Sequence, residues 1–181
     1  MPRTPDPELE ERLAKAALRL LDAGGLPAIT MRAVAREAGT TAPTIYERFT
    51  NRDKLLDSVK HEAELEALGA VRHARNVTEY VKRSLEFGVQ HPHRFELRAD
   101  TFGSRLGAGQ PMPVYELLKE ALTKELGIFG AKRDQLAMAI ASLVLGTTRG
   151  MIAAGSSTPA AKDLNRTCLA ALQLLLKAFS D

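Results

Sequence analysis

The chain has 181 residues, a length that suits one compact unit or two small ones that share a core. Hydrophobic residues make up 45% and charged residues 26%, which are values of a globular protein and exclude a disordered tail. The net charge is only +3, so binding to nucleic acid would have to rest on positioned contacts rather than on bulk charge. The single cysteine, Cys168, excludes an internal disulfide and fits a reducing cytoplasm.

Several familiar sites are missing from the sequence. It has no zinc-type spacing of Cys and His, no HExxH and no G-x-S-x-G, and the glycine-rich stretch after Phe102 lacks the Lys-Ser/Thr of a P-loop. His91 and His93 flank a proline and could share a metal, although a surface pair at a helix start explains them as well. The N-terminus is polar, and no apolar run reaches the ~20 residues of a membrane span. We therefore expect a cytoplasmic protein with no catalytic residue, metal, cofactor or membrane partner.

The chain opens with a predicted arm, Met1 to Pro5, and a helix that Asp6-Pro7-Glu8 starts. Proline suits the first helical position, and acids there face the positive end of the helix dipole. Gly24-Gly25 should end this helix, because glycine favours the residues just past a helix C-terminus.

Residues Thr30 to Phe49 predict two short helices joined by a tight turn. Thr30 and Thr41 are good N-caps, because a threonine hydroxyl accepts a hydrogen bond from a free backbone N–H of the first turn. Gly39 stands where the chain needs a left-handed residue to leave the first helix. Ile45 and Phe49 face inward, and the outer side of the second helix is polar. A helix this short is not stable alone, so the pattern favours a helix-turn-helix, whose second helix enters the major groove. An ordinary αα-corner would show the same spacing.

The wider pattern resembles the DNA-binding domain of the TetR family of bacterial transcriptional regulators. The resemblance covers roughly the first third of the chain and rests on Gly39, Thr44-Ile45-Tyr46, Phe49, Arg52-Asp53 and Leu55. It implies an all-α fold with an N-terminal three-helix helix-turn-helix DNA-binding domain over residues 1–50. A C-terminal helical ligand-binding and dimerisation domain would follow over residues 51–181, with a connecting helix at 51–75. The C-terminal part resembles the family only in size, helical character and two apolar final helices.

The candidate DNA contacts gather around the second short helix. Tyr46 and Thr41 should donate to phosphates, and Arg52 should add a charge beside free backbone N–H groups at a helix start. Thr30 and Arg32 should touch phosphate from the bracing helix. Short side chains should face base edges and favour methyl contacts with thymine over arginine–guanine pairs; they are Thr40, Ala42, Pro43 and Thr44.

Four further segments have local signals. Asn51 should cap a long helix that runs to about Arg75, which the resemblance implies is the lever between ligand and DNA. Thr78 to Gln90 predicts a helix, and His91-Pro92-His93 starts the next one. Gly103 to Pro113, with three Gly and two Pro, is the most loop-like segment of the chain. Val114 to Leu126 is again helical, and Gly127 closes it.

The resemblance places a ligand pocket among the helices from Val77 to about Arg149. Its candidate lining combines apolar residues with two arginines that lie close to apolar stretches: Phe87, Phe95, Arg98, Phe102, Tyr115, Leu118, Met138 and Arg149. Each apolar residue also fits a plain core position, and either arginine could snorkel to the surface. Because these helices carry few aromatics, we expect a modest, mainly aliphatic pocket.

The last two helices predict a homodimer. From Gln135 to Thr148 there is no charged residue, and a helix that is apolar nearly all round must be covered all round. Together with the helix from Pro159 to Phe179 it should form a four-helix bundle with a second copy, as in the TetR family. The expected interface is apolar: Leu136, Ile140, Leu143, Val144, Leu169, Leu172 and Leu176. A monomer whose shorter helices wrap this pair is the alternative.

The prediction is a dimeric, ligand-responsive repressor. Its partners would be a palindromic double-stranded DNA operator, a second copy of itself and a small-molecule inducer of unknown identity. A helical protein-interaction module without DNA binding and a small-molecule enzyme on a helical scaffold are the alternatives. Activation in place of repression would depend on where the operator lies.

Overall fold

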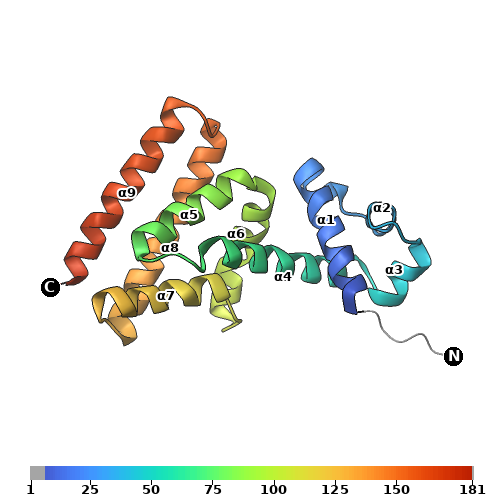
Figure 1. Ribbon diagram of the computed structural model, residues 1–181, viewed down its shortest axis with the longest axis horizontal. Helices are drawn as coiled ribbons and strands as arrows, with labels where there is room; N and C mark the ends of the chain where they lie inside the picture. The colour runs from blue at the N-terminus through green and yellow to red at the C-terminus, as the bar shows by residue number, and fades with distance from the viewer. Residues whose placement is uncertain (1–6, 181) are drawn as a thin grey trace.

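The computed structural model describes residues 7–180 and shows nine helices and no strand within that range (Figure 1). The helices are α1 (Pro7–Ala28), α2 (Met31–Glu37), α3 (Ala42–Arg48), α4 (Arg52–Val71), α5 (Val77–Gln90), α6 (Pro92–Gly107), α7 (Pro113–Leu126), α8 (Gly130–Ala154) and α9 (Pro159–Ser180). The all-α prediction is therefore confirmed. The arm expected at Met1–Pro5 and the cap expected at Asp6 lie outside the described residues.

Local signals placed most helix ends correctly. Asn51 accepts a hydrogen bond from the backbone N–H of Lys54 at 3.0 Å and so caps α4. Gly25 has a φ of 68°, and it breaks the helical conformation of α1 near the expected point. Gly127 ends α7 in the left-handed conformation with a φ of 66°. These ends depend on contacts within a few residues, which the sequence pattern contains.

The predicted loop at Gly103–Pro113 was mostly wrong, because α6 continues to Gly107. Tertiary contacts outweigh the poor helix propensity of its glycines. Arg105, in the last turn of α6, donates to Glu64 of α4 at 3.4 Å and also hydrogen-bonds the carbonyl of Pro111. These contacts hold the turn in place, and only residues 108–112 remain outside a helix.

Two buried clusters organise the chain. The first, which we call the head core, joins α1, α2, α3 and the first half of α4, and it includes Leu97 of α6. The second starts at Val71, near the end of α4, and joins α5, α7, α8 and α9. The clusters meet along α4 rather than at residue 50, so the division into 1–50 and 51–181 stays a prediction.

The molecule is elongated (Figure 1). The head, made of α1, α2 and α3, lies at one end, and the pair α8 and α9 lies towards the other. Helix α4 runs between the two ends, and α6 contacts α1, α4 and α5. A change in the middle of the molecule can therefore reach the head through α4 and through α6.

Helix α8 is long and apolar enough to span a membrane by length and composition alone. The sequence analysis had excluded such a run, because it counted uninterrupted apolar residues, whereas the mean hydropathy of an 18-residue window of α8 reaches 1.6. Core helices of soluble proteins pass the same test. Only 39% of that window is buried within the protomer, so much of this apolar helix lacks a cover.

The expected dimer interface needs a correction, because most of its residues pack the protomer itself. Leu136, Ile140 and Leu172 are fully buried, and Leu176 is 7% exposed. Leu143, Val144 and Leu169 are half-buried against the same core. Apolar residues on both sides of a helix look alike in sequence, and α5 and α7 cover the side that carries these leucines.

This core also contains a close helix–helix approach and a buried thiol. Helices α5 and α8 approach closely at Gly88, where an added Cβ would lie 2.5 Å from the Thr148 methyl group. Cys168 is 1% exposed in the same core, and burial raises the pKa of its thiol. A buried thiol with a raised pKa is a packing residue rather than a reactive one.

Candidate nucleic-acid interface and adjoining cavity

The corner between α2 and α3 has the predicted caps. The Thr30 hydroxyl accepts from the backbone N–H of Ala33 at 3.1 Å, and the Thr41 hydroxyl accepts from that of Thr44 at 3.4 Å. Gly39 turns the chain with a φ of 67°, in the left-handed region that favours glycine. Buried Ile45 holds α3 against the head core. The seven residues of α3 are thus fixed from one side, and the other side faces solvent.

The expected DNA contacts surround this free side. Tyr46 is 54% exposed, so its ring and hydroxyl are available to a partner. Thr30, Arg32, Thr41, Pro43 and Arg52 are also exposed, and Thr40, Ala42 and Thr44 are half-buried. The Thr41 and Thr44 hydroxyl oxygens lie 2.9 Å apart, so each is already engaged by the other. The surface consists of short polar side chains around one tyrosine.

Arg52 has a structural role that the sequence analysis missed. Its Nε donates to the carbonyl of Ile29 at 2.8 Å, and its Nη2 donates to that of Leu26 at 2.9 Å. The guanidinium therefore ties the start of α4 to the segment between α1 and α2. The expectation that Arg52 adds a charge beside phosphate stays a prediction, and two of its donors are committed within the head.

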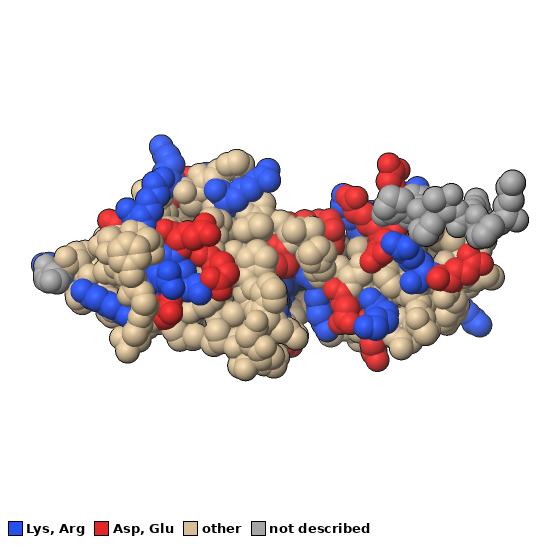
Figure 2. Space-filling model, turned by 90° about the horizontal axis from the view of Figure 1, so that it is seen from below, with Lys and Arg blue, Asp and Glu red and all other residues tan. Residues whose placement is uncertain are grey.

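The basic residues of the head are mostly paired. Arg19 binds Glu37 at 2.7 Å, and Arg48 pairs with Glu10 of α1. Among residues 7–180, no ion pair involves Arg32 or Arg36, both of which are exposed on α2. Sequence reasoning included Arg32 but not Arg36, although both lie on the bracing helix. On the face shown in Figure 2, basic and acidic side chains are interspersed rather than gathered in one basic band.

A cavity lies between the connecting helix and α5, α6, α7 and α8. The cavity has a free volume of about 90 Å³. This is room for a few water molecules, or for a ligand on the order of ten non-hydrogen atoms. Six of the expected ligand residues line it: Phe87, Phe95, Arg98, Phe102, Tyr115 and Leu118.

The two other expected ligand residues lie elsewhere. Met138 packs against the C-terminal core, and it is not part of the lining. Arg149 lies on the surface of α8, where its Nη2 binds Glu96 at 2.8 Å and Asp100 at 2.7 Å. Both lie on the same face of α8 as the lining residues Ala141 and Leu145, but about one turn before or after them along the helix.

The lining is mainly aliphatic, as the sequence analysis expected: eight alanine, valine and leucine residues outnumber its aromatic ones. Of the nine Phe and Tyr residues in the chain, five line the cavity: Tyr80, Phe87, Phe95, Phe102 and Tyr115. The rings of Phe102 and Tyr115 meet edge to face with centroids 5.6 Å apart. Three helices thus bring more than half of the few rings of the chain to one place.

Glu64 of α4 is the only carboxylate in the cavity lining, and the sequence analysis did not single it out. Its side chain is 7% exposed and binds Arg98 at 2.9 Å and Arg105 at 3.4 Å. It also accepts the backbone N–H of Val114 at 3.2 Å. Burial alone would raise the pKa of Glu64, but these three donors outweigh burial and hold that pKa below its usual value. The carboxylate is therefore ionised at neutral pH.

Helix α6 joins this cavity to the head. Arg94, which is 9% exposed, donates from Nε to both carboxylate oxygens of Asp22 in α1, at 2.9 and 3.1 Å. It also pairs with Glu66 of α4. On the same helix Leu97 enters the head core and Arg98 enters the cavity lining. Helix α6 thus contacts the head through Arg94 and Leu97 and the cavity through Phe95 and Arg98.

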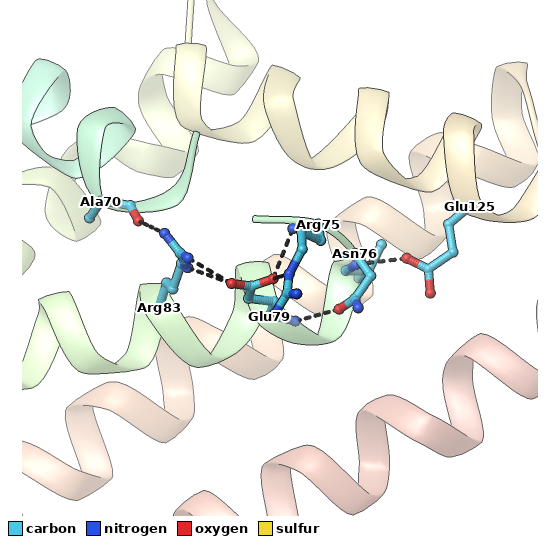
Figure 3. A network of polar contacts seen from close by, with 7 residues as sticks. Ala70, Arg75, Asn76, Glu79, Arg83 and Glu125 are labelled. Atoms are coloured by element: carbon cyan, nitrogen blue, oxygen red, sulfur yellow. Dashed lines mark hydrogen bonds and ion pairs between the residues drawn. The ribbon is translucent and has the colours of Figure 1, made fainter. Parts of the chain in front are cut away.

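A second polar network fixes the far end of α4 (Figure 3). Glu79 of α5 accepts the backbone N–H of Arg75 at 2.9 Å and pairs with Arg83 at 2.6 Å. Arg83 also donates to the carbonyl of Ala70 at 3.4 Å. The backbone N–H of Arg75, followed by the Arg83 and Arg75 side chains, lowers the pKa of Glu79 to about 2. This network makes the α4–α5 connection a fixed corner.

Among residues 7–180, no group of three or more His, Cys, Asp and Glu residues is placed to hold a metal ion. His91 instead stacks on Phe87, with ring centroids 5.0 Å apart. The cavity has polar and aromatic groups suited to binding a small molecule, and the head has an exposed helix suited to a groove.

Comparisons with known proteins concern the head and the overall fold. A family model described as bacterial regulatory proteins, tetR family, matches residues 13–59, which contain α2 and α3. No curated protein matches the sequence. The structure is similar to that of Mycobacterium smegmatis BioQ, with a TM-score of 0.64 and 26% identity over 94% of this chain and 97% of that one. A structure of BioQ with its natural double-stranded DNA operator is similar as well, with a TM-score of 0.66 and 25% identity over 94% and 97% of the two chains.

The transcriptional regulator SCO7222 from Streptomyces coelicolor has the same fold. Its TM-score is 0.74 at 20% identity, over 94% of this chain and 97% of that one. The similarity to these structures therefore extends over both buried clusters, whereas the sequence match is confined to the head and the start of α4.

Proposed function

We propose that this chain is a homodimeric repressor that a small molecule releases from a palindromic operator. It is a DNA-binding transcriptional regulator of the TetR family of bacterial regulatory proteins, whose family model matches residues 13–59. The observation that carries the proposal is the pairing of two sites. The head, which carries an exposed recognition-type helix, and the cavity are joined by α4 and α6, which contact α1 of the head and line the cavity.

The DNA contact would be made by the free side of α3. In a helix-turn-helix the N-terminal residues of the second helix reach base edges, and here these are Ala42, Pro43 and Thr44. Tyr46 would donate to a phosphate, and Arg32 and Arg36 would add charge from α2. That BioQ has been crystallised with its natural operator supports this assignment for a chain of similar fold.

A dimer would use the uncovered sides of α8 and α9. On α9 the exposed residues and one half-buried alanine follow a heptad spacing of alternating four and three: Ala160, Leu164, Thr167, Ala171, Leu174 and Ala178. Such a spacing places small and apolar side chains on one seam of a helix pair. Leu174 is 72% exposed in the protomer. On α8 the exposed residues Ser142, Gly146 and Ala153 are small, so a second helix can approach closely.

Burying these two faces against a second copy explains why α8 is apolar beyond the needs of the protomer. A two-fold dimer also places two heads at a set separation, as binding to a palindrome requires. The dimer would leave the operator if the ligand binds more tightly to a dimer whose heads lie at another separation. A nearly complete switch needs a preference of about 10⁴-fold.

Selection of bound sequences from a random duplex pool tests the DNA site. We expect a palindrome to be enriched, and Tyr46→Phe to weaken binding to it. Arg32→Gln should lower the slope of log affinity against log salt by about 0.9 for each lost phosphate contact, or about 1.8 for a dimer. Lys82→Gln removes the same charge from exposed Lys82 on α5, far from the head, and should leave the slope unchanged.

The same experiment separates the alternatives. A protein-interaction module would enrich no duplex and would show no salt-dependent affinity. Equal slopes for Arg32→Gln and Lys82→Gln would remove α2 from the interface even if an operator is found.

A further inference from the structure

The charged groups of the cavity form an unbalanced set. Two guanidinium groups, of Arg98 and Arg105, share one carboxylate, that of Glu64. Within the cavity lining there is no other charged side chain. The set therefore has a net charge of +1 beside an apolar interior, and an unbalanced charge is costly where water is scarce.

The donors of Arg98 are only partly used. Within the described residues, its one hydrogen bond runs from Nε to Glu64. Arg105 uses one terminal nitrogen on Glu64 and the other on the carbonyl of Pro111. Both terminal nitrogens of Arg98 are thus left for another acceptor, and a planar guanidinium matches the two oxygens of a carboxylate.

A cationic ligand fits this site poorly. Glu64 is the only group that could balance it, and three donors, from Arg98, Arg105 and the Val114 backbone, already surround that carboxylate. A cation would have to displace at least one arginine and leave it unpaired. The site favours an anion of single charge.

The walls indicate the rest of the ligand. Phe87, Phe95, Phe102 and Tyr115 line the cavity beside the arginines. Aromatic rings favour offset or edge-to-face contact with another ring. The free space of about 90 Å³ limits an enclosed ligand to on the order of ten non-hydrogen atoms.

We propose that the inducer is a small aromatic monocarboxylate, whose charged group binds Arg98 and whose ring lies among the phenylalanines and Tyr115. This inference rests on the proposed function for its regulatory meaning, but the binding itself does not depend on it. The ligand would balance the charge of Arg98 and Arg105 and would act on the contact of Arg98 with Glu64, which joins α6 to α4. Both helices contact the head, so the contact lies on the path from cavity to DNA.

Three probes with one ring and different charge test the ligand class on the full-length protein without DNA. Benzoate, benzyl alcohol and benzylamine carry charges of −1, 0 and +1 at neutral pH, and calorimetry measures their binding. We expect benzoate to bind at least tenfold more tightly than the alcohol, and the amine to bind no more tightly than the alcohol. Arg98→Gln should weaken benzoate at least tenfold and leave the alcohol unchanged, because only the charged group contacts that side chain.

Arg83→Gln is the matched control, since Arg83 pairs with Glu79 outside this cavity and its loss should not change benzoate affinity. If Arg98→Gln does not fold, Arg105→Gln tests the same charge and should also weaken benzoate. The proposal is overturned if the alcohol or the amine binds as tightly as benzoate, if no probe binds at millimolar concentration, or if the variants that fold bind benzoate normally.

Operator binding, measured separately, distinguishes the two proposals. If the wild-type protein binds its operator but does not bind benzoate, only the proposed ligand class is overturned. Tight, Arg98-dependent benzoate binding that does not release the operator would support the ligand class and overturn release by this ligand.

Discussion

Replacing Arg94 with methionine should loosen the joint between the head and the rest of the chain. The Arg94 side chain is 11% exposed and connects Asp22 of α1 with Glu66 of α4. Methionine fills much of the same space but leaves two carboxylates facing each other without a cation. The loss should therefore come from stranded charge rather than from a cavity.

The magnitude follows from the exposure of the two carboxylates. Breaking a fully buried ion pair costs about 3–5 kcal/mol. The side chains of Asp22 and Glu66 are 34% and 35% exposed, so water can take over part of the lost contact. We expect a loss of about 2 kcal/mol, which for a chain of this size lowers Tm by roughly 4–8 °C.

Urea unfolding of three proteins checks the reasoning. The wild type is compared with Arg94→Met and with the triple variant Arg94→Met/Asp22→Asn/Glu66→Gln, which carries no stranded charge. The triple variant should recover most of the lost stability, because its polar amides can be left near water at small cost. A triple variant as unstable as Arg94→Met would refute the argument from stranded charge. The argument would also fail if the unfolding free energy of Arg94→Met lies within about 0.5 kcal/mol of the wild-type value, which is the usual range of a neutral surface change.

Three other predictions use different parts of the molecule. The pKa of Glu79 is lowered from 4.5 to about 2, so its contribution to stability is complete above pH 4.5 and is lost as the pH falls towards 2. The difference in unfolding free energy between wild type and Glu79→Gln should therefore shrink to zero over that interval. A difference that stays constant with pH would contradict this prediction. Gly88→Ala should destabilise the protein by about 1–3 kcal/mol because the new methyl group lies 2.5 Å from a side chain of α8. Gly69→Ala, in open space on α4, should instead stabilise the protein by up to about 1 kcal/mol. Thermal unfolding of both variants checks this pair, and equal changes in the free energy of unfolding would refute the close approach at Gly88. Leu174→Glu should convert the dimer to a monomer in light scattering, while Leu65→Glu, at an exposed leucine of α4, should not; a dimeric Leu174→Glu would exclude the proposed face.

The candidate DNA site was the most predictable part of the protein. The caps at Thr30, Thr41 and Asn51 are hydrogen bonds to a residue three positions on, and Gly39 acts through its own backbone, so each signal is contained in a short window. The structural role of Arg52 was missed for the opposite reason. Its acceptors, the carbonyls of Leu26 and Ile29, lie 26 and 23 residues away in the chain.

The cavity was only partly predictable. Its aromatic residues could be named from the sequence, but their convergence could not, since Phe87, Phe102 and Tyr115 come from three different helices. Glu64 was the main omission. On a long helix rich in acids it looks like any solvated glutamate, and only the positions of Arg98 and Arg105 on α6 make it a buried one.

Most helix ends, the all-α class and the helix-turn-helix of the head could be predicted from the amino-acid sequence alone. These properties depend on contacts between residues a few positions apart, which recur wherever the same pattern occurs. Only the tertiary structure decided which sides of α8 and α9 remain free, which charges are paired, and which rings share a cavity. Hydrophobic burial has no direction, so an apolar residue such as Leu136 indicates that it is covered but not by which helix.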